Sequence, residues 1–411
     1  MVKISRYILV LTAIVGFSMV LPQLYRMAFS KPYRMPFIMY SCTENEFMIR
    51  RSNKGVTWEN EKGNSYSRAE FEKRLPLMYV RQLMVANNMP DTIGGIEMNL
   101  FDISHHSSSI ILTQAKLNAP KPGLYPLFES ESDRINLQMP NDFFRITWRM
   151  EFIDASTNQI SEEKSRMFSA ALYNRGFQFP AKSISGIPNV RKAYDEGYLV
   201  IDSGNQLFHV KMIQGAPYVE KIELPNELIF KHIECVDFRD RKFYAYLFST
   251  DNEMYILTQD EYELIKFPVP NIDPTKNEIR IYGDIFHYNI IIYGSNLIKA
   301  YVLDSDYNFV DEYEEPTPTN EQTREEKIFR ALFPGQIEIT SPNSNFIKFF
   351  VKINRPFHWL VLNFILTALQ FFIVKQKKSV LKNNVIDFAI IALFGIFGFL
   401  PVHIFPNKFF D

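Results

Sequence analysis

The sequence predicts a membrane-anchored α+β protein, in which one N-terminal and two C-terminal transmembrane helices carry an antiparallel β-rich, propeller-like extracytoplasmic domain. Three observations predict it: long uncharged runs near both ends, a weak repeat of short aromatic strands between them, and four lysines between the last two runs. The average composition of the 411 residues, 22% charged and 46% hydrophobic, is that of a soluble protein. The membrane prediction therefore depends on the local runs.

The first run, residues 7–25 (YILVLTAIVGFSMVLPQLY), contains no charged side chain. At about 1.5 Å per helical residue it is long enough to cross a hydrocarbon core. Lys3 and Arg6 precede it, which is also the layout of a signal peptide. The run is long for a signal peptide, however, and Arg26 intervenes before the nearest cleavage-type sequence. We therefore expect residues 1–29 to form a short cytoplasmic segment and an uncleaved transmembrane helix.

The second and third runs, FHWLVLNFILTALQFFIV at 357–374 and VIDFAIIALFGIFGFLPVHIF at 385–405, are also long enough to span. We expect them to form transmembrane helices 2 and 3 within residues 356–411. A buried helical hairpin of a soluble domain is the alternative. Core helices rarely keep so many uncharged residues in a row, which favours the membrane.

Three residues of the third run bear on function. An acid inside a membrane is a functional candidate, but Asp387 lies so close to the start of the run that solvation at the interface is the favoured interpretation. Gly395 and Gly398 would let another helix approach closely, although their spacing is not the four-residue spacing of the common dimer motif.

The lysines between the second and third runs predict the orientation. The loop at 375–384 is short and basic, and such loops stay in the cytoplasm. Three spans put the N-terminus on the same side, so residues from about 26 to 355 lie on the far side. Basic residues flank the spans there too, but long segments translocate largely regardless of charge. The orientation signals are Lys3, Arg6, Lys375, Lys377, Lys378 and Lys382.

Residues 30–141 are predicted to form a small α+β region that ends in an irregular connection. PFIMYSC and EFMIRRS have the pattern of a hairpin, and Ser67 and Glu70 have the spacing of a capping box that opens a helix. Pro76 should kink or restart this helix, and MPDTIGG should end it. Four prolines make residues 111–141 an irregular segment.

Residues 142–318 are predicted to form a β-rich repeat domain. Tyr198, Tyr244 and Tyr288 each open an apolar strand, a polar turn, a second apolar strand and a third strand, and Phe152 marks a more divergent unit. A period of about 40 to 50 residues is typical of propeller blades. An antiparallel sandwich with evenly spaced hairpins is the alternative. Residues 319–355 should form a helix and a linker that lead back to the membrane.

Charge and cysteine content exclude some classes of partner and of stabilisation. The terminal segments 1–29 and 356–411 each carry net +3, which leaves −7 on residues 30–355. A mildly acidic domain has no electrostatic footprint for DNA or RNA, so no nucleic-acid partner is expected. Cys42 and Cys235 are too far apart in a large chain to suggest a disulfide framework, and we expect them to stay separate.

No catalytic, cofactor or metal motif is recognisable. Phosphate loops, nucleophile elbows, His-Glu-x-x-His helices and Cys-x-x-Cys pairs are missing from the sequence. His105 and His106, beside Asp102, lack partners at ligand spacing, so a surface loop is favoured. Asp304-x-Asp306-x-Asn308 begins like a calcium loop, but Phe309 occupies the glycine position, which favours a polar turn.

Two functions remain open from the residues alone. The first is a non-enzymatic binding or interaction protein. The second is a membrane-tethered hydrolase acting on glycan or peptide, because paired carboxylates brought together by folding suffice for glycoside cleavage. Its candidate acids include Glu129, Glu131 and Asp133.

The layout also resembles a known family. GFSMVLPQLYRMAFSKPYRMPF at 16–37, ISGIPNVRKAYDEGYLVIDSGNQLFHVKM at 184–212 and the two terminal runs are similar to a family of membrane proteins from Bacteroides-type Gram-negative bacteria that is defined by a domain of unknown function. The resemblance implies a bacterial inner-membrane protein with a periplasmic domain, and ABC transporter subunits as partners. It carries no catalytic motif, so it transfers no site residue.

Overall fold

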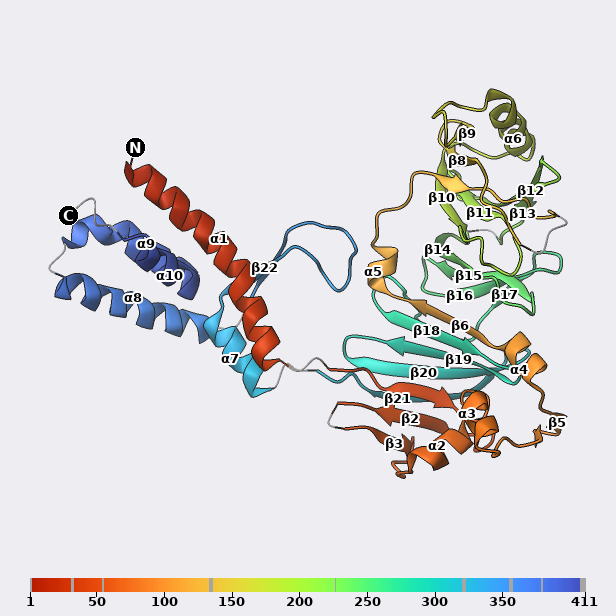
Figure 1. Ribbon diagram of the computed structural model, residues 1–411, viewed down its shortest axis with the longest axis horizontal. Coiled ribbons are helices and arrows are strands. Elements are labelled where there is room, and N and C mark those ends of the chain that lie inside the picture. Colours follow the sequence, from red (N-terminus) through yellow and green to blue (C-terminus); the bar gives the residue numbers. More distant parts are fainter. Residues whose placement is uncertain are drawn as a thin grey trace. The chain divides into compact units, whose positions relative to one another are not determined.

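The computed structural model describes residues 2–30, 33–53, 55–132, 136–225, 227–319, 323–354, 358–377 and 380–406. The chain divides into two compact units (Figure 1). A helical unit comprises residues 1–35 and 318–411, and a β unit comprises residues 36–317.

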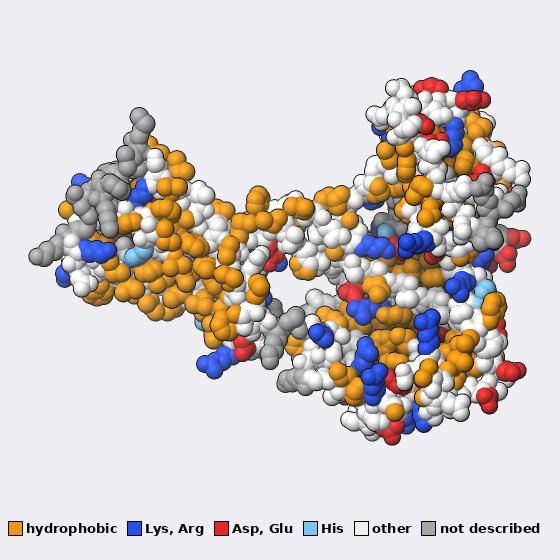
Figure 2. All heavy atoms as spheres, in the orientation of Figure 1, with side chains coloured by type: hydrophobic (Ala, Val, Ile, Leu, Met, Phe, Trp, Pro, Cys, Tyr) orange, Lys and Arg blue, Asp and Glu red, His pale blue; other side chains and the backbone are white. Residues whose placement is uncertain are grey.

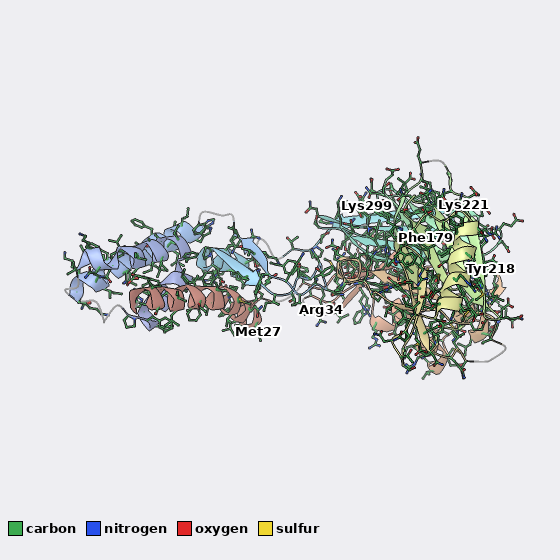
Figure 3. All side chains as sticks on the ribbon, turned by 90° about the horizontal axis from the view of Figure 1, so that it is seen from above. Met27, Arg34, Phe179, Tyr218, Lys221 and Lys299 are labelled. Carbon is green, nitrogen blue, oxygen red and sulfur yellow. The ribbon has the colours of Figure 1, made fainter. Side chains whose placement is uncertain are left out.

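The helical unit contains two helices that are long and apolar enough to cross a membrane, Ile4–Phe29 within α1 (Val2–Phe29) and α8 (His358–Gln376). Large apolar side chains of both helices are exposed, including Met27, which is 83% exposed (Figure 3). Figure 2 shows the same property as a broad hydrophobic surface on the helical unit. The other elements are α7 (Arg324–Leu332), β22 (Gly335–Glu338), β23 (Phe350–Ile353), η1 (Leu381–Asn384), α9 (Val385–Phe394) and α10 (Ile396–Ile404).

The prediction of a third transmembrane helix is wrong. The run at 385–405 breaks at Gly395, whose φ of 56° lies where only glycine is comfortable, into α9 and α10. Arg6 contacts both Asp387, at the start of α9, and the carbonyl of Phe405, just after α10. The run is therefore a helical hairpin whose two ends lie at one level. Each arm is about 15 Å long, half of a hydrocarbon core.

The β unit consists mainly of five antiparallel sheets. Two have three strands: β1 (Phe37–Tyr40), β2 (Phe47–Arg51) and β3 (Thr57–Asn60), and β7 (Tyr125–Pro126), β8 (Asp142–Ile146) and β9 (Met150–Asp154). Two have four strands: β10 (Ala181–Gly186), β11 (Tyr198–Asp202), β12 (Leu207–Ile213) and β13 (Ala216–Ile222), and β14 (Phe230–Cys235), β15 (Phe243–Ser249), β16 (Met254–Thr258) and β17 (Leu264–Lys266). The fifth contains β18 (Glu278–Gly283), β19 (His287–Tyr293), β20 (Leu297–Asp304), β21 (Phe309–Pro316) and β6 (Ser108–Leu112).

The predicted repeat corresponds to three successive sheets. Tyr198, Tyr244 and Tyr288 lie in β11, β15 and β19, the second strand of each repeat, and Asn205 and Asn252 adopt positive φ in the turns that follow the first two. The sequence pattern missed the first strand of each sheet. Phe152 lies in β9, so the divergent unit predicted there is the three-stranded sheet β7–β9, which is followed by α6 (Glu162–Asn174).

The sheets stack face to face, and the central ones are buried on both faces. Adjacent residues of a strand point to opposite faces, so Tyr198 packs toward β7–β9 while Leu199 joins the core shared with β14–β17. In the same way Leu247 packs toward β10–β13 and Tyr246 toward β18–β21. A two-layer sandwich would leave one face of each sheet exposed, so it is not the arrangement observed.

The N-terminal part of the β unit is not separate from the repeats. The hairpin β1–β2 forms as the sequence indicates, and the capping box at Ser67 opens α2 (Arg68–Arg74) before the chain restarts as α3 (Val80–Val85). However, β6 extends into the start of the stretch expected to be irregular and β7 lies within it, and β6 pairs with β18 while β7 pairs with β8. The structure therefore has no domain boundary between residues 141 and 142. Shorter elements here are β4 (Thr92–Ile93), β5 (Ile96–Glu97), α4 (Leu100–His106) and α5 (Gln114–Leu117).

Candidate functional sites

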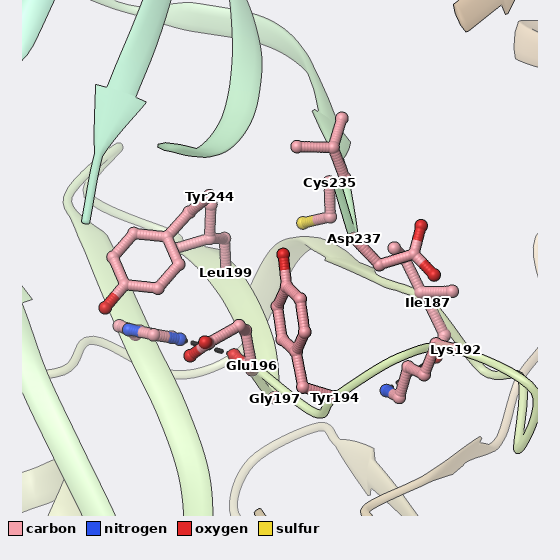
Figure 4. A pocket seen from close by; sticks show the side chains of 11 residues that line it. Ile187, Lys192, Tyr194, Glu196, Gly197, Leu199, Cys235, Asp237 and Tyr244 are labelled. Carbon is pink, nitrogen blue, oxygen red and sulfur yellow. Dashed lines mark hydrogen bonds between the residues drawn. The ribbon is translucent and has the colours of Figure 1, made fainter. Parts of the chain in front are cut away.

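A buried polar cluster lies where the loop after β10 meets the four-stranded sheets (Figure 4). Lys192 and Asp195 form an ion pair whose side chains are 2% and 0% exposed. The carboxylate of Asp195 also accepts hydrogen bonds from Ser130 Oγ (2.6 Å) and from the backbone N–H of Gly197 (3.1 Å). The ammonium of Lys192 donates to the carbonyl of Ile187 (2.8 Å). Protein groups thus replace water as the partners of both charges. A buried ion pair needs such partners, because removing each charge from water is costly.

His209, on β12, also belongs to this cluster, and it is 1% exposed. Its Nε2 contacts the carbonyl of Glu196 (2.5 Å), so Nε2 carries the hydrogen, and Nδ1 accepts from the hydroxyl of Tyr262 (2.8 Å). Burial, helped by the charge of Lys211, lowers the pKa of His209 to about 3. The imidazole is therefore neutral near pH 7 with both nitrogens occupied, so it is not available as a general base.

The space enclosed by this cluster is too small for a substrate. Its volume is about 20 Å³, enough for about one water molecule. The carboxylate of Glu196 is held by Lys211 and Arg241. Burial raises the pKa of the Cys235 thiol to about 12, which keeps it protonated and unreactive. The arrangement can lock the loop against the sheets, but it offers no activated nucleophile.

A larger groove lies between the first strands of the two four-stranded sheets. Its volume is about 500 Å³, and it is lined by Ser183–Pro188 of β10 and the following residues, by His232–Cys235 of β14, and by the proline-rich stretch 116–122. Among the described strands, β10 and β14 are both edge strands. Edge strands present backbone N–H and C=O groups on one side. The groove therefore combines ligand-sized space with two strand edges.

The helical unit contains a buried ion pair that joins α1 to α9. Arg6 Nη1 and Nη2 donate to the two carboxylate oxygens of Asp387, each at 2.9 Å, and Arg6 Nε donates to the carbonyl of Phe405 (2.8 Å). The side chains are 7% and 2% exposed. The expectation that Asp387 is solvated at the interface is therefore wrong, because a guanidinium supplies its partners in place of water.

The other orientation signals lie at the same end of α8. Lys375 is in its last turn, Lys377 follows it and Lys382 lies in η1, and all three are exposed. Lys378 and the side chain of Lys3 lie outside the described residues.

The remaining candidate residues have structural partners. His105 and His106 end the short helix α4, where His105 stacks on Phe101, so they do not lie in a loop. Asp304 accepts from the backbone N–H groups of Asp306 and Asn308 (both 2.9 Å), which is the predicted polar turn. No group of three or more potential metal-ligating side chains occurs in the described part of the chain.

The candidate hydrolase acids do not converge in the described residues. Glu129 accepts from the backbone N–H groups of Gln214 (2.7 Å) and Gly215 (2.9 Å), so its carboxylate fastens the β12–β13 turn. Glu131 is exposed, and Asp133 lies outside the described residues. Cys42 and Cys235 are both free thiols, as expected.

A family model described as "Domain of unknown function (DUF4857)" matches residues 37–303, more than half of the chain. The chain belongs to the DUF4857 family. The DUF4857 match begins at the first residue of β1 and ends inside β20, so it contains the polar cluster and the groove but neither membrane-length helix. No curated protein matches the chain.

Solved structures provide a weak likeness to the DUF4857 protein. One is the β-propeller domain of Myceliophteria thermophila Cps50 (Swd1), with 11% sequence identity and a TM-score of 0.25. The alignment covers 49% of this chain and 57% of that domain, so the chain spans little more than half of the structure it matches. We base no argument on a similarity of this size.

Proposed function

We propose that this DUF4857 protein is an integral inner-membrane protein of a Gram-negative bacterium that displays its β unit in the periplasm as a non-enzymatic interaction domain. Its partner class is a membrane protein complex, with subunits of an ABC transport system as the specific candidate. We further propose that the sheets of the β unit are arranged like propeller blades. The observation that supports this is their face-to-face packing.

The anchoring part of the proposal is supported by α1 and α8. Both have membrane length and exposed apolar side chains, and exposed lysines follow the end of α8. Short basic loops favour the cytoplasm. Two spans, like three, put the N-terminus on the same side as those lysines, so residues 36–317 lie on the opposite side of the membrane.

The observation that carries the interaction role is the groove between β10 and β14. An extended peptide can add to a strand edge, with affinity from main-chain hydrogen bonds and specificity from side-chain pockets. Ser183 and Ser185 on β10, and Glu234 on β14, place small or polar side chains along this groove. The bound segment would be an extended stretch of a partner subunit.

The test is site-specific photo-crosslinking in native membranes. A photoreactive amino acid at Ser185 lies in the groove, and one at the exposed Gln159 lies outside the residues that line it and serves as the matched control. We expect a specific adduct from position 185, absent at 159, whose partner peptide belongs to a transporter subunit. Recovery of a lone monomer, with equal background at both positions, would contradict the interaction role.

The hydrolase alternative has no favourable observation in the described residues. Of its candidate acids, Glu129 already accepts two backbone hydrogen bonds, and the buried cluster around His209 has no room for a sugar or a peptide. We therefore do not develop it as a second function.

A further inference from the structure

The helical unit contains an apolar cavity of about 340 Å³, within the size range of ligand sites. Its walls come from three parts of the unit: α1, the strands β22 and β23 with Trp359, and the tip of the α9–α10 hairpin. Representative lining residues are Ile14, Val15, Ile337, Val351 and Leu393. The proposed function places two of the contributing helices, α1 and α8 with its Trp359, in the membrane.

Specific contacts join the elements that form the walls. At the hairpin tip, Asn363 Nδ2 of α8 donates to the carbonyl of Ala392 (2.9 Å). At the strands, Asn354 Nδ2 donates to the carbonyl of Phe333 (2.8 Å), and Phe333 stacks on Phe397 with ring centroids 5.6 Å apart. The cavity is therefore built into the packing of this unit and is not a gap between loosely packed helices.

The chemistry of the lining selects an apolar ligand. Its polar side chains are satisfied by the protein: Ser18 Oγ donates to the carbonyl of Val15 (2.8 Å), Gln336 Nε2 donates to Glu338 (2.6 Å), and Lys352 pairs with Glu338 (2.6 Å). Nothing here requires a hydrogen-bonding ligand. An alkyl chain would fill the space with dispersion contacts and leave these bonds intact.

An exposed apolar stripe leads away from the cavity. It consists of every second residue from just before β23 to its end, namely Ile347, Phe349, Val351 and Ile353, which are 83%, 72%, 69% and 73% exposed. Val351 and Ile353 also line the cavity. A contiguous apolar surface of this kind marks an interaction site, and the chain enters α8 only a few residues later.

The depth of the cavity indicates the leaflet. Asn363, which holds the hairpin tip, is closer to the start of α8 than to its lysine-bearing end. Trp359, in the first turn of α8, lines the cavity, and tryptophan favours the membrane–water interface. Lys352 in β23 and Lys348 just before it lie at the same end, where they would meet a phosphate headgroup.

We propose that this cavity binds one alkyl chain of a phospholipid from the periplasmic leaflet, with the headgroup near Lys348 and Lys352. This inference rests on the proposed membrane anchoring.

The test uses the full-length protein reconstituted in vesicles that contain a phospholipid with a diazirine on one acyl chain. After illumination, mass spectrometry of peptides measures where the chain is attached. We expect adducts concentrated on the peptides containing Ile337 and Val351. Val15→Trp fills the cavity and should abolish most of that labelling, because the indole occupies the space in which the chain would make its dispersion contacts.

Leu11→Trp is the matched control, because Leu11 is one helical turn away on α1 and 50% exposed, compared with 47% for Val15, but does not line the cavity. It should leave the labelling unchanged. Labelling spread evenly over the exposed faces of α1 and α8, or unaffected by Val15→Trp, would overturn the alkyl-chain site while leaving the anchoring proposal standing. Failure of the protein to float with the vesicles would overturn both.

Discussion

Arg6 and Asp387, 381 residues apart in the sequence, form an ion pair in which two guanidinium nitrogens each lie 2.9 Å from a carboxylate oxygen. The pair connects the start of α1 to the start of α9, and the third nitrogen reaches the carbonyl of Phe405 after α10. These contacts fix both ends of the α9–α10 hairpin at one level of the helical unit. Arg6, predicted from the sequence to be an orientation signal, is thus a packing partner in the structure.

Removing one partner of this pair should be strongly destabilising. Arg6→Met leaves a buried carboxylate without its counter-ion, which costs about 3–5 kcal/mol. The double variant Arg6→Met/Asp387→Leu removes both charges and should recover much of that loss. The midpoint of thermal unfolding in detergent measures the effect. Unchanged stability of the single variant would show that the ion pair does not hold the hairpin.

The hairpin also predicts where the end of the described chain lies. Cysteine placed at Pro406 should be labelled by a membrane-impermeant maleimide from the same side as cysteine at Lys377, and from the opposite side to cysteine at Ser30. The native thiols give little background, because burial raises the pKa of Cys42 and Cys235 to about 12. Labelling of positions 406 and 30 from the same side would contradict the hairpin and indicate that residues 385–405 span the membrane.

Local patterns predicted much of the fold. The capping box at Ser67 and the polar turn at Asp304 depend on neighbouring residues, and both form as the sequence indicates. The tyrosine period located three successive sheets, because each repeat carries its own hairpin. Long-range pairing was not accessible in this way: nothing in SSIIL at 108–112 shows that it will pair with β18, about 170 residues later.

The candidate sites were less accessible to sequence reasoning. Run length and hydropathy do not distinguish a span from a hairpin of two short helices, and the signal that could have done so is Gly395 near the middle of the third run. The partner of Asp387 was likewise invisible, since nothing local connects it to Arg6. The groove depends on which strands become sheet edges, and the first strand of each repeat lies outside the recognised pattern.

His209 predicts an acid-dependent loss of stability. In the unfolded chain it binds a proton as the pH falls below its ordinary pKa of 6.5, whereas in the folded protein it does so only near pH 3. The unfolded state therefore gains protons first, and folding stability falls with decreasing pH across this window, by about 1.4 kcal/mol per pH unit at its steepest. Denaturant unfolding of the full-length protein in detergent, compared between pH 6.5 and 5, measures this slope.

His209→Gln is the control for that slope. It keeps a side-chain N–H for the carbonyl of Glu196 but removes the titrating group. The variant should be less stable at pH 7 and should lose the steep dependence between pH 6.5 and 5. The carboxylates of Asp154 and Asp273, whose pKa values are lowered to about 2, do not titrate in this range. An unchanged slope in the variant would assign the acid sensitivity to other groups.

Gly395→Ala should destabilise the helical unit because it affects both the backbone and the packing of the hairpin tip. The residue has a φ of 56°, and a Cβ atom there would lie 2.0 Å from Asn363 Oδ1, so Asn363 would have to abandon its bond to Ala392. Backbone strain and the lost contact together should cost at least about 2 kcal/mol. Gly16→Ala in α1 is the matched control, since a Cβ there meets nothing within 4 Å and alanine favours a helix. The control should be neutral or slightly stabilising in the same thermal assay, and equal behaviour of the two variants would mean that residues 385–404 form one continuous helix.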